Sequence, residues 1–315
     1  MKLGCACWTF TKGRFLPPYE PAVEIIGELG FEGVEFILRN VDDLDEYWTA
    51  SRVDTLRELC ARYDLAVSQF SFFQDTVADL ASLDGDARQR ALDVFARGVR
   101  LAVALGAQLV NFVSQWPVGI KAPAAYVPRY WYTNQPGLDF FQPKLTMQLP
   151  QPFVWDQIWE NYVDSIRQCV QIVEQHGLKL AFEGHAHVIV PHTDSFLRLW
   201  DHIRSPALGY NLDTAWQFIQ REYLPWSVYK LSDKLLHVHA RDGDGLHCYS
   251  LPPGEGIIDW PGLVQALRDV GYDGFISLEL GGLSDPIPWV TSARRHLNDA
   301  LIHSAVQETR GNSPT

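Results

Sequence analysis

The chain has 315 residues, of which 47% are hydrophobic and 20% are charged, a composition typical of an ordinary globular protein. We expect a single domain over residues 1–315, because α/β domains of this length are common. The formal net charge of −12 argues against a nucleic-acid partner, since nucleic acids are bound largely through contacts of lysine and arginine with phosphate. It argues in the same way against binding to an anionic membrane surface.

The chain carries no sign of a membrane or secretory segment. It contains no run of about 18 apolar residues, and residues 1–10 lack the long apolar stretch of a signal peptide. We therefore expect a cytoplasmic protein. Five cysteines, an odd number lying mostly in apolar runs, favour reduced thiols of the core: Cys5, Cys7, Cys60, Cys169 and Cys248.

Short β-rich segments alternate along the chain with longer segments of helical periodicity. This alternation predicts parallel strands joined by crossover helices. Eight such units predict an α/β fold of one closed (β/α)8 TIM barrel. The expected strands are 3–8, 33–36, 65–72, 108–114, 178–183, 208–213, 235–240 and 275–280.

The predicted helices have recognisable capping residues at their ends. Asp259 is an expected N-cap, because its side chain can accept hydrogen bonds from the first helical turn, which contains Pro261. Residues 311–315 are expected to form a frayed tail. Glycine follows two of the three longest predicted helices, which span 87–105, 155–176 and 289–307.

One long insertion, residues 115–152, separates the fourth predicted strand from its helix. It contains seven prolines and seven aromatic residues, among them Trp116. Loops longer than about 15 residues are uncommon and usually functional or disordered, and this aromatic content argues against disorder. Because the insertion follows the carboxyl end of a strand, where barrel enzymes keep their sites, we interpret it as a lid or pocket wall. A contact between subunits is the alternative interpretation.

Four side chains of metal-binding type stand at the ends of the last four predicted strands. The carboxyl ends of barrel strands meet on one face, so these side chains should converge. Burying an uncompensated carboxylate is costly, and three carboxylates with one imidazole therefore predict a divalent cation. The mainly oxygen ligand set favours Mn²⁺, with Mg²⁺ or Co²⁺ as alternatives, over a thiolate-type zinc site. The expected ligands are Glu183, Asp213, His239 and Glu279.

The sequence around these ligands resembles the xylose-isomerase-like TIM barrel superfamily of sugar isomerases and epimerases. The resemblance covers most of the chain and implies that the four residues bind one metal ion, as their counterparts do in ketohexose 3-epimerases and inosose isomerases. The motifs are Ala-Phe-Glu183-Gly-His, Gly-Tyr-Asn-Leu-Asp213-Thr, His237-Val-His239-Ala-Arg-Asp242, Gly254-Glu-Gly256-Ile-Ile-Asp-Trp and Phe-Ile-Ser-Leu-Glu279.

The chemistry implied by the resemblance is proton transfer next to the carbonyl of a keto-sugar or cyclitol. A metal-held enediolate would lead to isomerisation or epimerisation, with Glu183 and Glu279 as catalytic residues. If a leaving group stands β to the carbanion, the same intermediate would eliminate it. The alternative function is therefore a lyase that removes an aglycone or another group from an oxidised sugar, such as a 3-oxo-glycoside.

The sequence departs from the ketohexose 3-epimerases at three positions. Ile189 stands where those enzymes place a second catalytic glutamate, Trp216 where they place a histidine, and Gly245 where they place an arginine. The two-glutamate mechanism is therefore in doubt. His185, which a continuing strand would point to the same face as Glu183, is the candidate base, with a hydrogen bond to a carboxylate as the alternative role.

The remaining candidates stand at the ends of other predicted strands or next to a ligand. His237 alternates in phase with His239 and is expected to be a partner of the ligands rather than a ligand. Asp242 and Arg241 are expected to orient ligands or substrate. The candidate substrate-binding residues, for which barrel packing or ion pairing is the alternative, are Trp8, Glu35, Gln69, Asn111, Trp116 and Arg241.

Two further functions receive less support from the sequence. A nuclease resembling endonuclease IV would need a three-zinc cluster with additional histidines, yet no histidine precedes His176 and Trp216 replaces a zinc-binding one. A barrel that only binds a sugar is disfavoured by the complete ligand set. A small-molecule sugar is the expected partner, together with a homo-oligomer and, for a lyase, a small second subunit.

Overall fold

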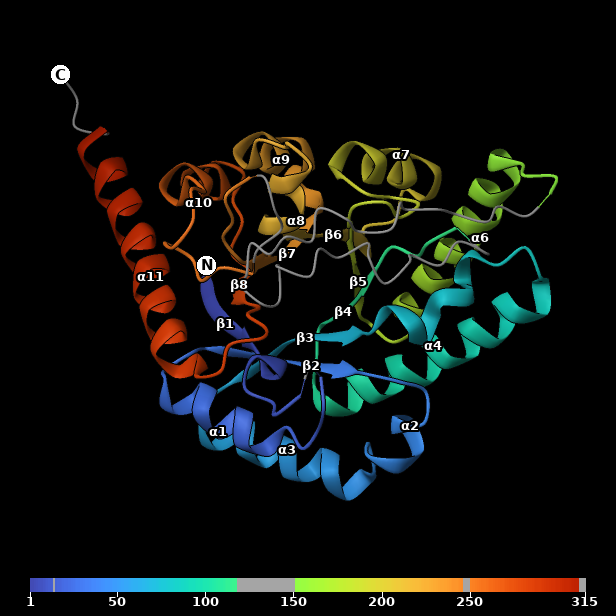
Figure 1. The fold of residues 1–315 in the computed structure, drawn as a ribbon, viewed down its shortest axis with the longest axis horizontal. Coiled ribbons are helices and arrows are strands. Elements are labelled where there is room, and N and C mark those ends of the chain that lie inside the picture. The colour runs from blue at the N-terminus through green and yellow to red at the C-terminus, as the bar shows by residue number, and fades with distance from the viewer. Residues whose placement is uncertain (14, 118–150, 246–249, 312–315) are drawn as a thin grey trace, which may run out of the picture.

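The computed structural model describes residues 1–13, 15–117, 151–245 and 250–311. Eight parallel strands form a closed barrel in the order of the sequence, which confirms the predicted TIM barrel (Figure 1). The strands are β1 Lys2–Ala6, β2 Gly33–Leu38, β3 Ala66–Phe72, β4 Leu109–Val113, β5 Lys179–Glu183, β6 Leu208–Asp213, β7 Leu235–Ala240 and β8 Phe275–Leu278.

The strands follow the predicted segments to within about two residues. All six residues of β2 are buried, because a barrel strand is covered by the barrel interior on one face and by helices on the other. Two ends differ from the prediction in a way that concerns the site. β1 ends at Ala6, before a 3₁₀ turn over Cys7–Thr9, and β8 ends at Leu278. Trp8 and Glu279 consequently lie just beyond their strands.

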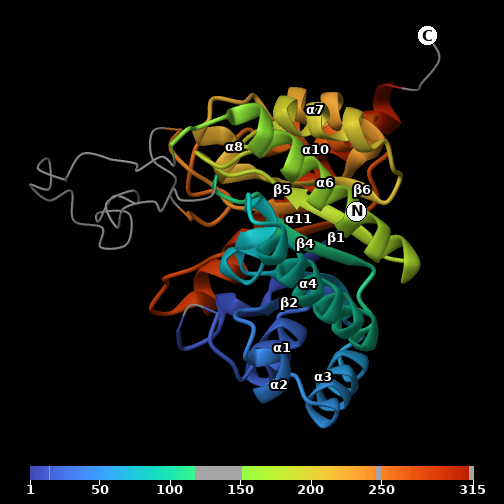
Figure 2. The same cartoon turned by 90° about the vertical axis from the view of Figure 1, so that its right-hand side faces the viewer.

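Helices surround the barrel (Figures 1 and 2), and the longer ones bury an apolar stripe in the core. In α10, the predicted N-cap Asp259 accepts a hydrogen bond from the Gly262 backbone at 3.0 Å. The helices are α1 Glu20–Glu28, α2 Asp43–Glu46, α3 Ala50–Arg62, α4 Gly85–Leu105, α6 Trp155–Gln175, α7 Thr193–Ile203, α8 Thr214–Ile219, α9 Leu224–Leu231, α10 Trp260–Asp269 and α11 Pro286–Gly311, with 3₁₀ turns at Cys7–Thr9, Gln74–Ala81 and Ser232–Lys234.

Two predicted segments fall largely or partly outside the described residues. Of the predicted lid, residues 118–150 are not described, so the lid stays a prediction. At its start, the Gln115 side chain accepts a hydrogen bond from the Tyr162 hydroxyl of α6 at 2.5 Å. The predicted tail begins inside α11, which extends to Gly311, and residues 312–315 are not described.

The core lies between the strands and the helices and is rich in aromatic rings. Phe72, Phe95, Phe112 and Phe182 follow one another around the barrel with ring centroids 5.0 to 5.7 Å apart. Tilted and edge-on pairs of this kind add about 0.5–1.5 kcal/mol each beyond the burial of area. Among the described helices, none combines the length and apolar character needed to span a bilayer.

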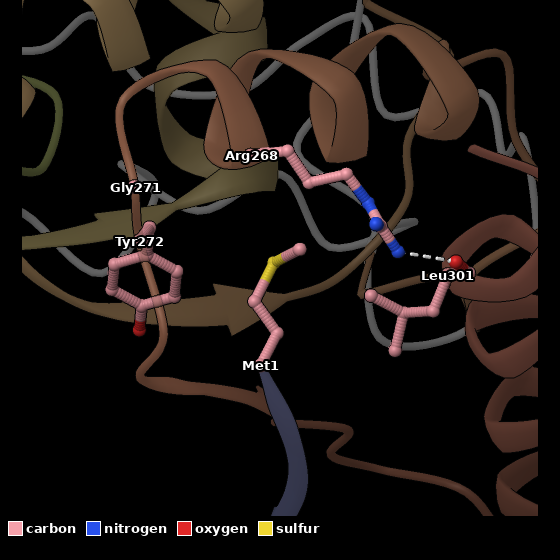
Figure 3. A pocket seen from close by; sticks show the side chains of 5 residues that line it. All are labelled: Met1, Arg268, Gly271, Tyr272 and Leu301. Atoms are coloured by element: carbon pink, nitrogen blue, oxygen red, sulfur yellow. Dashed lines mark hydrogen bonds between the residues drawn. The ribbon is translucent and has the colours of Figure 1, made fainter. Parts of the chain in front are cut away.

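The opposite end of the barrel from the strands' carboxyl ends has a separate pocket of about 370 Å³ (Figure 3). One of its lining residues, Arg268, donates a hydrogen bond through Nη2 to the Leu301 carbonyl at 2.5 Å. None of the predicted site residues lines this pocket, which is formed by Met1, Arg268, Gly271, Tyr272 and Leu301.

The buried thiols should be inert in the folded protein. Burial raises the pKa of Cys60 to about 12 and raises those of Cys5, Cys7 and Cys169 as well. Because thiolate is the reactive form, we expect a chromogenic disulfide at pH 8 to react rapidly with at most one of the five thiols until the chain is denatured. Rapid reaction of two or more thiols in the native protein would contradict this expectation.

The same thiols give stability a definite pH dependence. In the unfolded chain they ionise near pH 9.0, whereas burial keeps them protonated in the fold. The folded state therefore holds more protons than the unfolded state above that pH. The free energy of unfolding should fall as the pH rises beyond 9.0, which chemical denaturation at a series of pH values would measure.

Candidate metal centre

All four predicted metal ligands converge at the carboxyl ends of the last four strands. Glu183 ends β5, Asp213 ends β6, His239 lies on β7 and Glu279 follows β8. One ligand atom from each lies within 4.8 Å of the others. The Nδ1 atom of His239 is 3.3 Å from Oε2 of Glu183 and 3.4 Å from Oε2 of Glu279. The three carboxylates thus gather on the Nδ1 side of the imidazole.

The donor set fits a divalent cation. Three carboxylates lie together in the protein interior, with side chains that are 3%, 0% and 15% exposed for Glu183, Asp213 and Glu279. Arg241, which donates through Nη2 to Asp213, supplies one positive charge among them. The carboxylates therefore exceed the arginine charge by two, and a divalent ion would balance this excess. Oxygen ligands with one imidazole suit Mn²⁺, Mg²⁺ or Co²⁺.

The electrostatics of the cluster show the same imbalance. Burial raises the pKa of Asp213, and although Arg241 opposes this, the carboxylates of Glu183 and Glu279 raise it further. Burial also disfavours the charged form of Glu183, but His239 and His185 outweigh it and hold the pKa of Glu183 well below its ordinary value. Burial lowers the pKa of His239, yet the surrounding carboxylates raise it well above its ordinary value. The negative charge of the carboxylates can therefore be balanced either by a proton on His239 or by a cation bound at its Nδ1 atom.

Glu35 lies within β2, is 0% exposed and contacts two histidines. Its Oε1 accepts a hydrogen bond from Nε2 of His237 at 2.8 Å, and its Oε2 lies 2.9 Å from Nε2 of His239. Gln69 donates to the same Oε2 at 3.2 Å. Burial raises the pKa of Glu35, but the two histidines more than offset this, so its pKa is held far below its usual range.

This contact sets the tautomer of His239. With Nε2–H directed at Glu35, a neutral His239 presents the lone pair of Nδ1 to the carboxylates, as a metal ligand must. Asn211 supports the arrangement, since its amide nitrogen donates to Glu183 Oε2 at 2.8 Å and lies 3.1 Å from Nδ1 of His239. Glu35, His237 and His239 also lie close enough together to hold an ion, but hydrogen bonds already satisfy the carboxylate.

The predicted substrate-binding role of Glu35 and Gln69 does not match their positions. Neither is among the described residues that line the cavity above the cluster. Both lie behind His239, on the side away from the carboxylates, and contact its Nε2 atom. Side chains that point into a barrel fill its packed interior as well as its open end. An inward side chain near the middle of a strand therefore contacts a metal-ligand side chain such as His239 and does not reach the cavity.

The candidate base His185 stands beside the predicted ligands. Its Nε2 lies 2.8 Å from Oε1 of Glu183, and its ring stacks on Trp216 with centroids 4.3 Å apart and planes at 27°. Its side chain is 22% exposed and lines the cavity. The hydrogen bond to a carboxylate, the alternative role, is therefore present, and catalysis by His185 stays a prediction. Trp216, at a position where epimerases carry histidine, orients the His185 ring.

The other predicted substrate-binding residues line the cavity. Trp8 donates through Nε1 to Oε1 of Glu279 at 3.1 Å. Asn111 donates to the Ala181 carbonyl at 2.9 Å and approaches Oε2 of Glu183 at 3.3 Å. Both residues thus contact ligands as well as the cavity, and they are joined there by Trp116 and Arg241.

Asp242 has a structural role instead of orienting ligands or substrate. Its carboxylate accepts hydrogen bonds from the backbone of Gly254 and Ile258 and from Nε1 of Trp260 at 2.8 to 3.1 Å. These bonds hold the loop between β7 and α10. Ile189, at the position of the second epimerase glutamate, is buried and 3% exposed.

The cavity has a volume of about 960 Å³ and lies at the carboxyl ends of the strands, where barrel enzymes bind ligands. Several residues at or near the cavity were not predicted. Asn211, which contacts Glu183 and His239 but is not among the described lining residues, stands two residues before Asp213 on β6, a period-2 signal that was available. Phe15 and Trp289 lie outside the strands and had no such signal. The other lining residues that had not been predicted include Ser71, Phe73, Glu255 and Leu283.

Comparison with known proteins extends these findings. Fructoselysine 3-epimerase of Escherichia coli O157:H7 is 28% identical over 126 residues, which cover 39% of this chain and 46% of that protein. Inosose dehydratase of Bacillus licheniformis is 26% identical over 212 residues, which cover 60% and 68% respectively. The solved structure of D-psicose 3-epimerase from Clostridium cellulolyticum H10 superposes with a TM-score of 0.74 at 17% identity, over 96% of this chain and 99% of that one.

The family assignment rests on most of the chain. A model of the xylose isomerase-like TIM barrel family matches residues 23–300, a span that includes seven of the eight strands and all four predicted ligands. The closed barrel and the cluster at its carboxyl end agree with this match. The chain belongs to the xylose isomerase-like TIM barrel family.

Proposed function

We propose that this protein is a divalent-metal-dependent isomerase or epimerase of a keto-sugar or cyclitol, acting by proton transfer next to a carbonyl. The observation that carries the proposal is the convergence of four ligand-type side chains within 4.8 Å of one another, three of which, Glu183, His239 and Glu279, line a large cavity together with His185. The relatives named as a sugar 3-epimerase and an inosose dehydratase support the same class of substrate.

The residues of the site have separable tasks in this proposal. A divalent ion held by Glu183, Asp213, His239 and Glu279, with Mn²⁺ the best match to the oxygen ligands, would polarise a bound carbonyl. His185 takes or returns the proton; its Nε2 lies 2.8 Å from Oε1 of Glu183, and its side chain lines the cavity. Trp216 restricts the imidazole to one orientation by stacking on it. Arg241 neutralises Asp213.

A lyase that eliminates a group from an oxidised sugar is the second candidate. Buried, apolar Ile189 occupies the position where the 3-epimerases place a second glutamate, which removes one of the two acid–base groups of their mechanism. Elimination needs one base next to the carbonyl, a task for which His185 suffices. The relative named inosose dehydratase is in keeping with this candidate. As a lyase the protein could require a small second subunit; in either case we expect a cytoplasmic homo-oligomer.

Proton–deuterium exchange followed by NMR tests the proposed function. The Mn²⁺-loaded protein is incubated in D₂O with ketohexoses, inososes and 3-oxo-glucosides. We expect exchange at the carbon next to the carbonyl, and a His185→Gln variant should slow it on the order of 100-fold, the usual contribution of a positioned base. His202→Gln is the matched control, because His202 contacts Trp159 on the outer helices.

The products separate the two candidates. A new sugar with its carbon skeleton intact supports the isomerase or epimerase, and a released aglycone or water supports the lyase. Absence of exchange with every substrate in the panel would contradict proton transfer by this site. Equal exchange in the wild type and His185→Gln would contradict the assignment of His185 as the base.

A further inference from the structure

Three aromatic rings form a continuous wall that leads away from the candidate metal centre. Trp8 is bonded to Glu279 at 3.1 Å, its ring lies 5.8 Å from that of Phe15, and the Phe15 ring lies 5.1 Å from that of Phe73. All three side chains line the cavity above the cluster. If the reacting carbon of a ligand is held at Glu279, the substituent attached to the ligand's carbon skeleton would therefore contact this wall.

The position of Phe15 indicates that the wall is held in place by its surroundings. Phe15 has a φ of 66°, a left-handed conformation that is unusual for a bulky residue. Such backbone strain persists where packing over-determines it and is concentrated at functional sites. Here it accompanies a ring that is buried between Trp8 and Phe73 and that faces the cavity.

Ser71 adds a polar group to the cavity wall. It is 4% exposed, lines the cavity, and its hydroxyl finds no hydrogen-bond partner among the described residues. A buried hydroxyl without a partner is costly, so a ligand oxygen is the natural acceptor or donor for it. Gln69 and Ser71 alternate on β3 and Phe73 directly follows its last residue, which places Ser71 between the His239 contact and the aromatic wall.

The size of the cavity excludes a close fit to a single sugar ring. Its volume of about 960 Å³ stands at the upper end of the range of about 300–1,000 Å³ that accommodates drug-sized ligands. A free hexose would leave much of this space next to the wall of Trp8, Phe15 and Phe73 unfilled. A planar apolar group joined to the sugar would fill this space and pack on the three rings.

We propose that Trp8, Phe15 and Phe73 form a subsite for an aryl substituent, and that Ser71 binds an oxygen of the sugar to which this substituent is linked. The substrate class is then an aryl glycoside of an oxidised sugar rather than a free ketose. The proposal rests on the proposed function only in that the sugar carbonyl lies at the metal centre; the subsite itself requires no reaction.

Binding of unreactive ligands tests the subsite. Phenyl β-D-glucoside and methyl β-D-glucoside have no ketone and differ only in the aglycone, so calorimetry with the Mn²⁺-loaded protein measures the aryl contribution alone. We expect the phenyl glucoside to bind at least about tenfold more tightly, the effect of one well-packed aromatic contact. Phe73→Ala should abolish this preference and Phe73→Tyr should restore it.

Two further variants make the result specific. Phe153→Ala, at a half-buried phenylalanine that packs on the core and is not among the described lining residues, should keep the preference. Ser71→Ala should weaken both glucosides by a similar factor of about five, the effect of one hydrogen bond. Circular dichroism and thermal melts confirm that each variant is folded.

The outcomes separate this proposal from the proposed function. Equal affinity for the two glucosides, no measurable binding of either at millimolar concentration, or a preference that survives Phe73→Ala would each overturn the aryl subsite. None of these results bears on deuterium exchange with free ketoses and inososes, which tests the reaction independently. Conversely, a clear phenyl preference would stand even if no exchange were found.

Discussion

Replacing Glu183 by glutamine will lower the affinity for Mn²⁺ by two orders of magnitude or more and abolish exchange of the substrate proton. Glu183 is the centre of the ligand cluster, since its two oxygens contact His185, Asn211 and His239 within 2.8 to 3.3 Å. Glutamine keeps the shape but removes the charge. Removing a residue that hydrogen-bonds to a metal ligand typically lowers metal affinity about 10–100-fold. Removing the charge of a ligand itself should lower the affinity by more.

Calorimetric titration of metal-depleted protein with Mn²⁺ measures the first prediction. Glu174→Gln is the matched control, because this glutamate accepts a hydrogen bond from Ser205 at 2.6 Å, away from the four ligands. The control should bind Mn²⁺ like the wild type. Wild-type affinity in Glu183→Gln would refute the assignment of Glu183 as a ligand, and unchanged exchange in the presence of a chelator would refute metal dependence itself.

Replacing Glu35 by glutamine will weaken Mn²⁺ binding about 10–100-fold, although Glu35 is no ligand. The glutamate accepts hydrogen bonds from His237 and His239 through separate oxygens. Glutamine has one acceptor, so its amide nitrogen must face one of the two imidazole N–H groups. In either orientation the neutral amide removes the negative charge that holds Nε2–H of His239, which weakens the contact that turns the lone pair of Nδ1 toward the carboxylates. Breaking this buried contact should also lower stability by about 3–5 kcal/mol.

A spectroscopic measurement separates this positioning role from general destabilisation. The absorption spectrum of the Co²⁺-loaded protein reports the geometry of the ligands, and it should change in folded Glu35→Gln. The comparison variant His237→Gln removes the other imidazole and leaves the pair of Glu35 and His239 intact, so its spectrum should resemble the wild type. A Glu35→Gln variant with an unchanged spectrum and a Mn²⁺ affinity within twofold of the wild type would show that the contact does not position His239.

The barrel and the four converging ligands could be predicted because local patterns carry the information. Each strand is a short apolar run, and the sequence places Glu183, Asp213, His239 and Glu279 at or near the ends of four such runs. A closed parallel barrel brings these ends to one face whatever the exact strand boundaries are. For this reason, ending β8 at Leu278 instead of residue 280 left the predicted position of Glu279 essentially unchanged.

The roles of individual side chains depended on contacts that the sequence does not encode locally. Glu35 and His237 are 202 positions apart and Trp8 and Glu279 are 271 positions apart, yet each pair is hydrogen-bonded. Period-2 alternation could show that Glu35 and Gln69 point inward but not how deep in the barrel they lie. Depth depends on the tilt and register of neighbouring strands, and it separates a residue that supports a ligand from one that faces the cavity.

The sequence by itself thus determined the fold class, the four candidate ligands and the face of the barrel on which these side chains meet, because strand periodicity and strand ends are local properties. Only the tertiary structure decided that Glu35 sets the orientation of His239, that Trp216 stacks on His185, and that the aromatic wall runs from Trp8 to Phe73. These arrangements arise when side chains from strands and loops distant in sequence are packed against each other. Their geometry is a property of the closed barrel rather than of any one segment.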